Sequence, residues 1–529
     1  MAEWNGIVIG GGHNALTCAA YLAKAGARMA VLERSEQIGG GTTTHEVTLP
    51  GFKHNLHANY FHGFDLAPIS TDLELDRHGF ELLMPEVQQA CLYRDGRALV
   101  IHRDLDRTCA SIARFSERDA DTYRTLYQRY GIDNRRFFTA QAFNPPVDAA
   151  GVRARLEAAG LDEIARFAAD TPYEVINRHF ESEPLRVLFK KLLHIVHAND
   201  FARTGAWFPL LISNVASATL PVGGAVNLPR ALAAVVTGHG GAVRTGAHVS
   251  RIVVEGGVVR GVELADGSTM TADFVVSGVD FPQTIQMANP SNFDDDVAAR
   301  ARNWRWTDEH SLMTLHLALD APPEYRAAQF DPDVQEAYNV QFGADDTNDL
   351  LVMFDEMRAG RFPSKPAGNG CTNTLFDPSY APDGKHVSFW WPFAPYELGG
   401  RAQAWAEGRE RYAQTLLSVW RMYATNLDDD TVLGTYLYTP YDIPRHDISM
   451  VRGSVRLGAY SAEQWGSNRP HAKLSDYRGG DRVQGLYHCG SGSASGGGVN
   501  GAPGYNAAGA VADDQGLDRW WEPLDLDAA

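Results

Sequence analysis

The sequence has 529 residues and only five cysteines. These are scattered, and no two stand in C-x-x-C or metal-ligand spacing; they are Cys18, Cys91, Cys109, Cys371 and Cys489. This scarcity argues against a disulfide framework and against a metal site. We therefore expect reduced thiols and a cytoplasmic protein.

Long apolar runs are also missing, and none approaches the roughly 20 residues that a membrane-spanning helix needs. Basic residues are outnumbered, with 47 Lys and Arg against 65 Asp and Glu, for a net charge of −18. Such a chain is not expected to bind nucleic acid or to adhere electrostatically to anionic lipid, although this leaves apolar docking on a membrane open. An apolar strand begins within the first ten residues, so we expect no targeting peptide.

Glycine, in contrast, is abundant, and its first cluster follows directly after an apolar run. The segment VIGGGHNALTCAAYLAKAGARMAVLER, residues 8–34, predicts a strand, a glycine turn, a helix over Asn14–Ala25 and a strand over Arg28–Leu32. The N–H groups at the start of such a helix suit a phosphate. A Rossmann-like dinucleotide site is therefore predicted at the beginning of the chain.

The spacing of individual residues supports this interpretation. Gly10, Gly12 and Ala15 fill the G-x-G-x-x-G/A positions. Glu33 follows about 20 residues later, where a carboxylate accepts a hydrogen bond from a ribose hydroxyl. The predicted dinucleotide contacts in this segment are Gly10, Gly12, His13, Asn14, Ala15, Glu33 and Arg34.

A second glycine cluster, Gly39–Gly41, follows in VLERSEQIGGGTTT, residues 31–44. This stretch resembles the FAD-binding N-terminus of the phytoene desaturase and flavin amine oxidase superfamily, closest to the phytoene-dehydrogenase-like branch that includes the pyridine nucleotide-disulphide oxidoreductase domain 2 proteins. The resemblance implies non-covalently bound FAD, with contacts from Gly39, Gly40, Gly41 and Thr42. Members often have Arg after the Gly-Gly pair, where this chain has Gly41, so a charge near the pyrophosphate is missing or comes from elsewhere.

Two later segments resemble the same superfamily. In residues 241–280 the resemblance implies that Val249 offers its backbone to the adenine, and Gly256-Gly257 predicts a hairpin turn. Residues 485–508, GLYHCGSGSASGGGVNGAPGYNAA, resemble the closing flavin motif. Because a helix N-terminus stabilises the negative charge of a reduced flavin, the predicted ring contacts there are Gly498, Val499 and Asn500, and Gly490 is a further predicted FAD contact.

These segments predict an α/β fold in which an FAD-binding domain is interleaved with an α+β substrate domain. The FAD domain is placed at residues 1–75, 215–290 and 445–529, and the substrate domain at 76–214 and 291–444. Helix starts at Ser116 and at Thr171-Pro172 make residues 115–200 mostly helical. We expect this helical block to form a lid over a pocket.

Candidate catalytic residues follow the second glycine cluster, in HNLHANYFHGF, residues 54–64. His57 stands where relatives commonly have glycine, so its imidazole is a candidate base or substrate-orienting group, with backbone hydrogen bonding as the plain alternative. Asn59, Tyr60 and His62 are weaker candidates of the same kind. Tyr441, Asp442 and His446 in TPYDIPRH are further candidates, with a structural aspartate cap as the alternative.

Other features are interpreted as structural. His194 and His197 share a helix face but have no carboxylates at metal-ligand spacing, so we expect a core or pocket-lining role. Cys18 stands alone on the first helix, which argues against a dithiol relay beside the flavin. Since no second strand–glycine–helix fingerprint is present, we expect no tightly bound nicotinamide. Some of the aromatic residues should wall an apolar pocket; they are Trp207, Phe208, Trp304, Trp306, Trp391 and Tyr441.

The remaining chemistry is transfer of a hydride from carbon to flavin N5. We expect a dehydrogenase or desaturase that forms a double bond in a largely apolar, alicyclic or isoprenoid-like substrate and passes electrons to O2 or a quinone. Three alternatives stay open: an amine oxidase, a redox-neutral isomerase that uses reduced FAD, and a flavoprotein scaffold without catalysis. The sequence does not indicate an oligomeric state.

Overall fold

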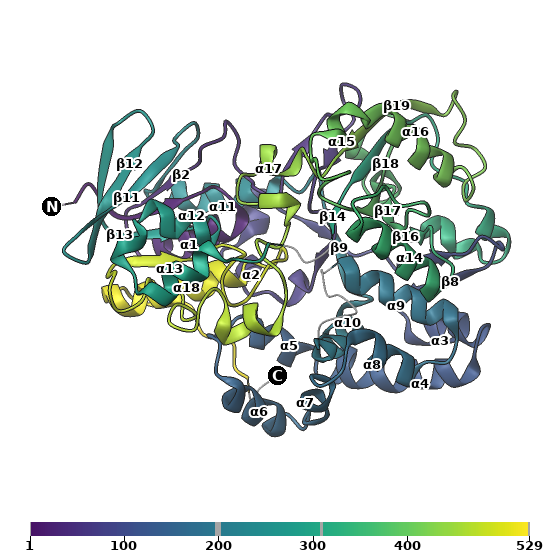
Figure 1. The fold of residues 1–529 in the computed structure, drawn as a ribbon, viewed down its shortest axis with the longest axis horizontal. Helices are drawn as coiled ribbons and strands as arrows, with labels where there is room; N and C mark the ends of the chain where they lie inside the picture. Colours follow the sequence, from purple (N-terminus) through teal and green to yellow (C-terminus); the bar gives the residue numbers. More distant parts are fainter. Residues whose placement is uncertain (1, 196–202, 307–309, 527–529) are drawn as a thin grey trace.

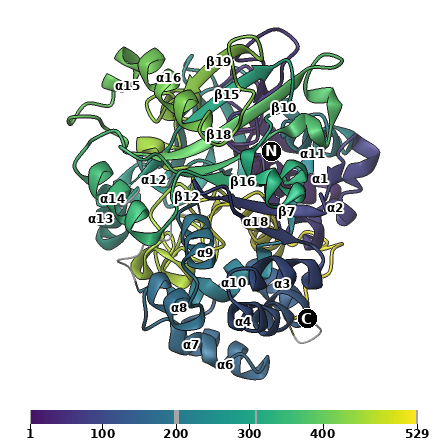
Figure 2. The ribbon, with the colours of Figure 1, turned by 90° about the vertical axis from the view of Figure 1, so that its right-hand side faces the viewer.

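The computed structural model describes residues 2–195, 203–306 and 310–526, which form two large sheets and a helical block (Figure 1). In Figure 1 the first sheet lies on the left, the second sheet at the upper right and the helical block below the second sheet. The view turned by 90° also places the helices α3, α4 and α6–α10 below the second sheet (Figure 2).

Among the described residues, the first sheet has seven strands in the order β10-β2-β1-β13-β12-β11, with β20 paired to β13. Pairing is parallel among β10, β2, β1, β13 and β20, and antiparallel from β13 through β12 to β11. The strands are β1 (Trp4–Ile9), β2 (Met29–Leu32), β10 (Ala242–Arg244), β11 (Val249–Glu255), β12 (Val258–Leu264), β13 (Thr269–Ser277) and β20 (Leu486–His488).

The side chains of this sheet alternate between its two faces, as the two-residue period of a strand requires. Val8, Val31 and Val276 pack on one face against the helices α1 (His13–Lys24), α11 (Asn227–Gly238) and α18 (Ala502–Gln515). Ile9 and Val275 pack on the other face, with β11, β12, α12 (Phe281–Met287) and α13 (Asp295–Arg302). The predicted Rossmann-like α/β arrangement is thereby confirmed.

The second sheet has eight strands among the described residues, in the order β19-β15-β18-β17-β16-β7-β8, with β14 paired to β18. On β18, Trp390 faces the helices α15 and α16, whereas Phe389 and Trp391 face the opposite side. The elements are β7 (Val87–Leu92), β8 (Ala98–His102), β14 (Ser311–Leu312), β15 (Thr314–Leu319), β16 (Asn339–Phe342), β17 (Gly368–Cys371), β18 (His386–Ala394), β19 (Val432–Tyr438), α14 (Thr347–Arg358), α15 (Ala404–Glu407) and α16 (Arg409–Trp420).

Short elements connect the two large sheets. Strand β3 pairs with β4, and β9 lies between β5 and β6. These connecting elements are α2 (Ile69–Asp72), α17 (Ile443–His446), β3 (Thr44–His45), β4 (His54–Asn55), β5 (Phe61–His62), β6 (Leu82–Leu83) and β9 (Ala218–Pro221). They bring residues 44–62 and 443–446 between the two sheets.

The helical block shares one apolar core, and its predicted caps are present. Ser116 accepts a hydrogen bond from the backbone N–H of Asp119 at the start of α4, and Thr171 forms a capping box with Glu174 at the start of α8. The helices are α3 (Leu105–Ala113), α4 (Glu117–Tyr127), α5 (Arg135–Ala142), α6 (Ala149–Ala158), α7 (Glu163–Phe167), α8 (Pro172–His179), α9 (Glu183–Ile195) and α10 (Phe208–Asn214). His197 lies outside the described residues, as does the side chain of His194.

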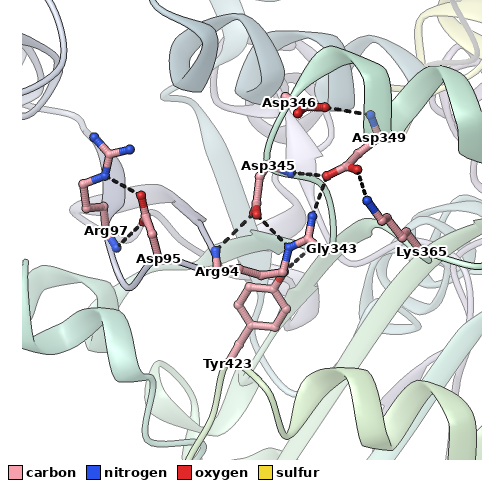
Figure 3. Close-up of polar contacts among 9 residues, drawn as sticks. All are labelled: Arg94, Asp95, Arg97, Gly343, Asp345, Asp346, Asp349, Lys365 and Tyr423. Carbon is pink, nitrogen blue, oxygen red and sulfur yellow. Dashed lines mark hydrogen bonds and ion pairs between the residues drawn. The ribbon is translucent and has the colours of Figure 1, made fainter.

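A charged network fixes the far edge of the second sheet (Figure 3). Arg94, in the turn after β7, pairs with Asp345 and with Asp349 of α14, each at 2.6 Å. Lys365 reaches the second oxygen of Asp349 at 2.5 Å. Because the Asp349 side chain is only 5% exposed, these pairs are less screened than surface ion pairs. The network therefore ties the β7–β8 hairpin to α14, and none of its members lines the cavity described below.

No helix in the described part of the chain is long and apolar enough to cross a membrane.

Candidate cofactor cavity and active site

A cavity of about 800 Å³ extends from the first sheet to the second. At the first sheet it is lined by the glycine turn after β1, by Glu33 after β2 and by Val249 on β11. At the other end it is lined by Leu312, Thr314 and residues of β18 and β19. One elongated space therefore joins the predicted dinucleotide site to the second sheet.

The cavity brings together most of the residues that the sequence predicted for the site. Seventeen of them lie in its wall: Gly10, Gly12, His13, Asn14, Ala15, Glu33, Arg34, Gly40, Gly41, His57, Asn59, Tyr60, His62, Val249, His446, Gly498 and Val499. Six do not: Gly39, Thr42, Gly490, Asn500, Tyr441 and Asp442. Of the six aromatic residues considered for the wall, Trp391 lines the cavity. The other five are not among its lining residues: Trp207, Phe208, Trp304, Trp306 and Tyr441.

Five of the residues outside the wall have contacts with residues close to them in the chain. The hydroxyl of Thr42 donates to the carbonyl of Gly39 at 2.7 Å, which closes the second glycine turn. The Asn500 side chain accepts from the N–H of Ala502 at the start of α18. The backbone carbonyl of Gly490 accepts from the N–H of Ser493. Tyr441 lies beneath the guanidinium of Arg445, 3.2 Å from its ring centroid.

The glycine turn leaves room for a phosphate. The position that a Cβ would take at Gly12 has no atom within 4 Å, and helix α1 begins there without a side-chain cap. The amide oxygen of Asn14 is buried without a hydrogen-bond partner. An uncapped helix N-terminus beside open space, with an unsatisfied polar group next to it, fits a bound pyrophosphate.

Glu33 is held in position by the backbone. Its two carboxylate oxygens accept from the N–H of Gly11 and of Ser35, both at 2.7 Å. Each carboxylate oxygen can accept more than one hydrogen bond, so lone pairs remain for a ribose hydroxyl. These observations show that the residues present fit the adenosine half and pyrophosphate of FAD.

The cavity wall contains a buried carboxyl group, Asp447, and three arginines. Asp447 comes close to the second glycine cluster, with a carboxylate oxygen 3.4 Å from the Cβ position of Gly40. Burial raises the pKa of Asp447 to about 6. The arginines that line the cavity are Arg34, Arg445 and Arg456.

His57 and its neighbours form a group of imidazoles in the cavity wall. The Nε2 atom of His57 lies 3.1 Å from the hydroxyl of Tyr438, and its ring centroid lies 5.5 Å from that of His446. The ring of His45 meets that of His446 edge-on at 5.2 Å. Burial holds the pKa of His57 well below its usual value, and His446 and His45 lower it further. His57 is therefore neutral at pH 7.

The other candidates differ in their surroundings. The side-chain oxygen of Asn59 accepts from Asn55 and Asn373 at 2.9 and 2.8 Å. Tyr60 packs edge-on against Trp391, with ring centroids 5.8 Å apart, and its hydroxyl is buried without a hydrogen-bond partner. Asp442 pairs with Arg409 at 2.8 Å and accepts from the N–H and the hydroxyl of Thr439, so its role is structural, but it makes no capping hydrogen bond to α17.

Sequence reasoning missed Tyr438, His45, Asp447 and Arg456 as cavity residues. Tyr438 directly precedes the TPYD segment, which is the signal that could have identified it. The sequence-based expectation that Cys18 stands alone was wrong. Burial raises the pKa of the Cys18 thiol, and the neighbouring Cys489 thiol raises it further. Neither thiol lines the cavity.

Comparisons with known proteins agree with this geometry. Residues 16–512 match the family of flavin containing amine oxidoreductases. A limonene dehydrogenase polypeptide of Castellaniella defragrans is 32% identical over 545 residues, covering 99% of this chain and 97% of that protein. Pyridine nucleotide-disulfide oxidoreductase domain-containing protein 2 of Rattus norvegicus is 31% identical, covering 96% of this chain and 93% of that protein.

Among solved structures, an oxidoreductase from Methanosarcina mazei has the same fold, with a TM-score of 0.59 at 16% identity over 96% of this chain and 99% of that one. The family match confirms the resemblance on which FAD was expected and identifies FAD as the cofactor. The chain is an FAD-dependent oxidoreductase and belongs to the flavin containing amine oxidoreductase family.

Proposed function

We propose that the protein dehydrogenates a largely apolar, alicyclic or isoprenoid-like substrate. FAD would accept the hydride at N5, and the electrons would then pass to O2 or a quinone. The observation that carries the proposal is the composition of the cavity at the second sheet. The wall residues on the second sheet and next to His57 are aliphatic, aromatic or neutral polar side chains, with no carboxylate among them: Leu56, His57, Leu312, Thr314, Trp391 and Tyr438.

This wall suits a hydrocarbon better than an amine. An ammonium group that leaves water needs a carboxylate or a cage of aromatic faces to offset its desolvation. A hydrocarbon needs only apolar surface and exclusion of water. The limonene dehydrogenase similarity points in the same direction, since limonene is a cyclic hydrocarbon.

We propose that His57 accepts the substrate proton and that Tyr438 orients the His57 ring. Removal of a hydride from one carbon leaves a proton to be taken from its neighbour, and a neutral imidazole can accept it. The Nε2–H of His57 can donate to the hydroxyl of Tyr438, which fixes the orientation of the ring and leaves Nδ1 free to accept that proton. The depressed pKa keeps the imidazole ready to accept but makes it a weak base, which suits an activated C–H bond.

The proposal is tested by anaerobic mixing of the FAD-loaded protein with three classes of compound. These are a cyclic monoterpene, an acyclic isoprenoid and a primary amine. Bleaching of the flavin absorbance by either hydrocarbon supports dehydrogenation, and bleaching by the amine alone overturns it. Turnover that needs prior reduction of the flavin and causes no net oxidation would establish an isomerase instead. Re-oxidation of the reduced protein by O2 or by a soluble quinone then identifies the acceptor.

A further inference from the structure

Within the part of the chain that the structure describes, Arg456 is a cation in the cavity wall without a counter-ion. It follows α17 in the chain and lines the cavity beside Gly498. No described carboxylate lies within ion-pair distance of its guanidinium, and its Nε atom is buried without a hydrogen-bond partner. By comparison, nearby Arg452 pairs with Glu397 at 3.1 Å.

The guanidinium is aimed at the glycine loop that precedes α18. An Nη atom of Arg456 lies 3.4 Å from the Cβ position of Gly498, and its Cδ lies 3.0 Å from that of Gly497. The loop is also held by Tyr460, whose hydroxyl accepts from the N–H of Gly497 at 2.6 Å. Trp207 of the helical block stacks on Tyr460 with ring centroids 5.3 Å apart. The loop and the arginine are therefore held together before any ligand binds.

A second arginine supports the first. Arg469 is fully buried and donates to the backbone carbonyl of Arg456 at 2.8 Å and to that of Ser491 at 3.0 Å. Its contacts connect the segment that carries Arg456 to the start of the glycine loop. A partly buried cation is costly in free energy unless an anion approaches it, and the Arg469 contacts hold the backbone of Arg456 next to the glycine loop.

We propose that Arg456 stabilises the negative charge of the reduced flavin ring and so sets the reduction potential of the bound FAD. The proposal goes beyond the proposed function and does not depend on the substrate. When the oxidised ring takes up two electrons and one proton, one negative charge remains on its N1–C2=O side. The sequence resemblance implies that Gly498 and Val499 face that side, and Arg456 is the cation beside them.

The arginine adds to the helix N-terminus that follows the loop. Helix α18 begins at Ala502 with Pro503 in its first turn. Its partial positive charge falls off within about one turn and is equivalent to roughly half an elementary charge. A full charge in a poorly solvated wall contributes more to an anion at hydrogen-bond distance.

The test compares the FAD-loaded wild-type protein with Arg456→Met and Arg456→Lys, and with Arg452→Met as the matched control. Sulfite adds to oxidised flavin and leaves a negative charge on the same side of the ring, so its dissociation constant reports the stabilisation directly. Because a hydrogen bond to a charged group is worth about 1.5–3 kcal/mol, Arg456→Met should weaken sulfite binding by roughly tenfold or more. Each tenfold change in equilibrium corresponds to about 30 mV for a two-electron couple, and the midpoint potential should fall accordingly.

Arg456→Lys should give intermediate values, and Arg452→Met should match the wild type. The proposal is overturned if Arg456→Met and Arg456→Lys both bind sulfite as tightly as the wild type at an unchanged potential. It is also overturned if both variants release FAD under conditions in which Arg452→Met retains it, because the cation would then hold the pyrophosphate. Neither measurement uses a substrate, so a failure here is distinct from a failure of the proposed dehydrogenation.

Discussion

At the scale of single residues, Glu33 connects the backbone geometry of the first sheet to cofactor binding. Its carboxylate is held by the N–H groups of Gly11 and Ser35 and lines the cavity. Replacing Glu33 with Gln removes the charge and one acceptor, so FAD affinity should fall by about tenfold or more. Titration of the apoprotein with FAD measures this. Glu74→Gln, at an exposed ion pair with Arg77, is the control, and unchanged affinity in Glu33→Gln would remove Glu33 from the site.

Replacement of His57 is expected to affect the chemical step and not the binding of FAD. His57→Ala should retain FAD, because other residues of the cavity wall fit the dinucleotide. It should slow reduction of the flavin by substrate by roughly 10²-fold, the usual share of a positioned acid–base group. Since the pKa of His57 is held well below its usual value, the wild-type rate should not fall from protonation of this group between about pH 6.5 and 8.

Stopped-flow measurement of flavin bleaching tests both expectations, with exposed His239→Ala as the control. His57→Gly restores the residue that relatives commonly have and should be as slow as His57→Ala. Wild-type rates in both variants would make His57 a packing residue. The search for a base would then move to Tyr438 and His446.

The residue scale also shows what could be predicted from the sequence. Gly12 and Glu33 were predictable because a local motif of about 25 residues contains the whole physical reason for them. The contact between His57 and Tyr438 spans 381 positions in the chain. No local sequence pattern predicts a contact between residues so far apart in the chain, because the contact forms only when the two sheets pack next to each other. Arg456 escaped notice for the same reason, since its lack of a partner is a property of the folded surroundings.

At the scale of elements, the contact between α1 and α18 positions both ends of the flavin site. A Cβ at Gly504 would lie 2.1 Å from the carbonyl oxygen of Asn14, so the two helices approach with no room for a side chain. Gly504→Ala should therefore force the helices apart and destabilise the protein by about 1–3 kcal/mol. The shift also moves the N-terminus of α1, so FAD should dissociate more readily.

Gly238→Ala is the matched control, because Gly238 ends helix α11 and its Cβ position has no atom within 4 Å. Alanine is the better helix former there by up to about 1 kcal/mol, so this variant should be neutral or slightly more stable. Melting temperatures and FAD release rates of the two variants provide the comparison. If both variants behave alike, close packing of α1 on α18 does not position the site.

Elements were predicted well where their signals are local. The hairpin of β11 and β12 and the capping box of α8 follow from turn and cap residues that the sequence shows directly. The predicted helix over Asn14–Ala25 is found one residue earlier, at His13–Lys24, because Gly12 supplies the N-cap. Pairing β10 with β2 could not be read in this way, because it joins strands more than 200 residues apart.

At the scale of the whole molecule, the fold consists of two sheets joined by short strands, with the cofactor cavity extending between them. The helical block contributes no described residue to the cavity wall. It supports the site indirectly, through Trp207 on Tyr460. The predicted lid is therefore better described as a support for the glycine loop, and the predicted domain boundaries remain predictions.

Buried histidines make the stability of the whole molecule depend on pH. Burial lowers the pKa of His54 to about 3 and that of His488 to about 4, and neither is among the cavity-lining residues. In the unfolded chain a histidine has a pKa of about 6.5. Between these values the unfolded chain binds protons that the folded protein does not. Their stabilising contribution is therefore complete above about pH 6.5 and is lost as the pH falls toward 4.

Two buried carboxyl groups act in the opposite sense. Burial raises the pKa of Asp280 to about 7 and that of Asp447 to about 6, so they favour the folded protein less as the pH rises. The histidines outnumber them, because burial also lowers the pKa of His13, His62 and His446 to about 4. Acidification from pH 7 to 5 should therefore lower the melting temperature.

The variant His488→Gln tests this explanation directly, because Gln cannot take up a proton. His488 is 4% exposed and its Nε2 has no hydrogen-bond partner, so the substitution removes the titrating group without breaking a described side-chain bond at that atom. One pKa unit corresponds to about 1.4 kcal/mol, so one histidine accounts for roughly 1–2 kcal/mol between pH 7 and 5. The drop in melting temperature over this range should be smaller in His488→Gln than in the wild type. It should be unchanged in the exposed control His239→Gln, and equal drops in all three proteins would mean that acid sensitivity has another origin.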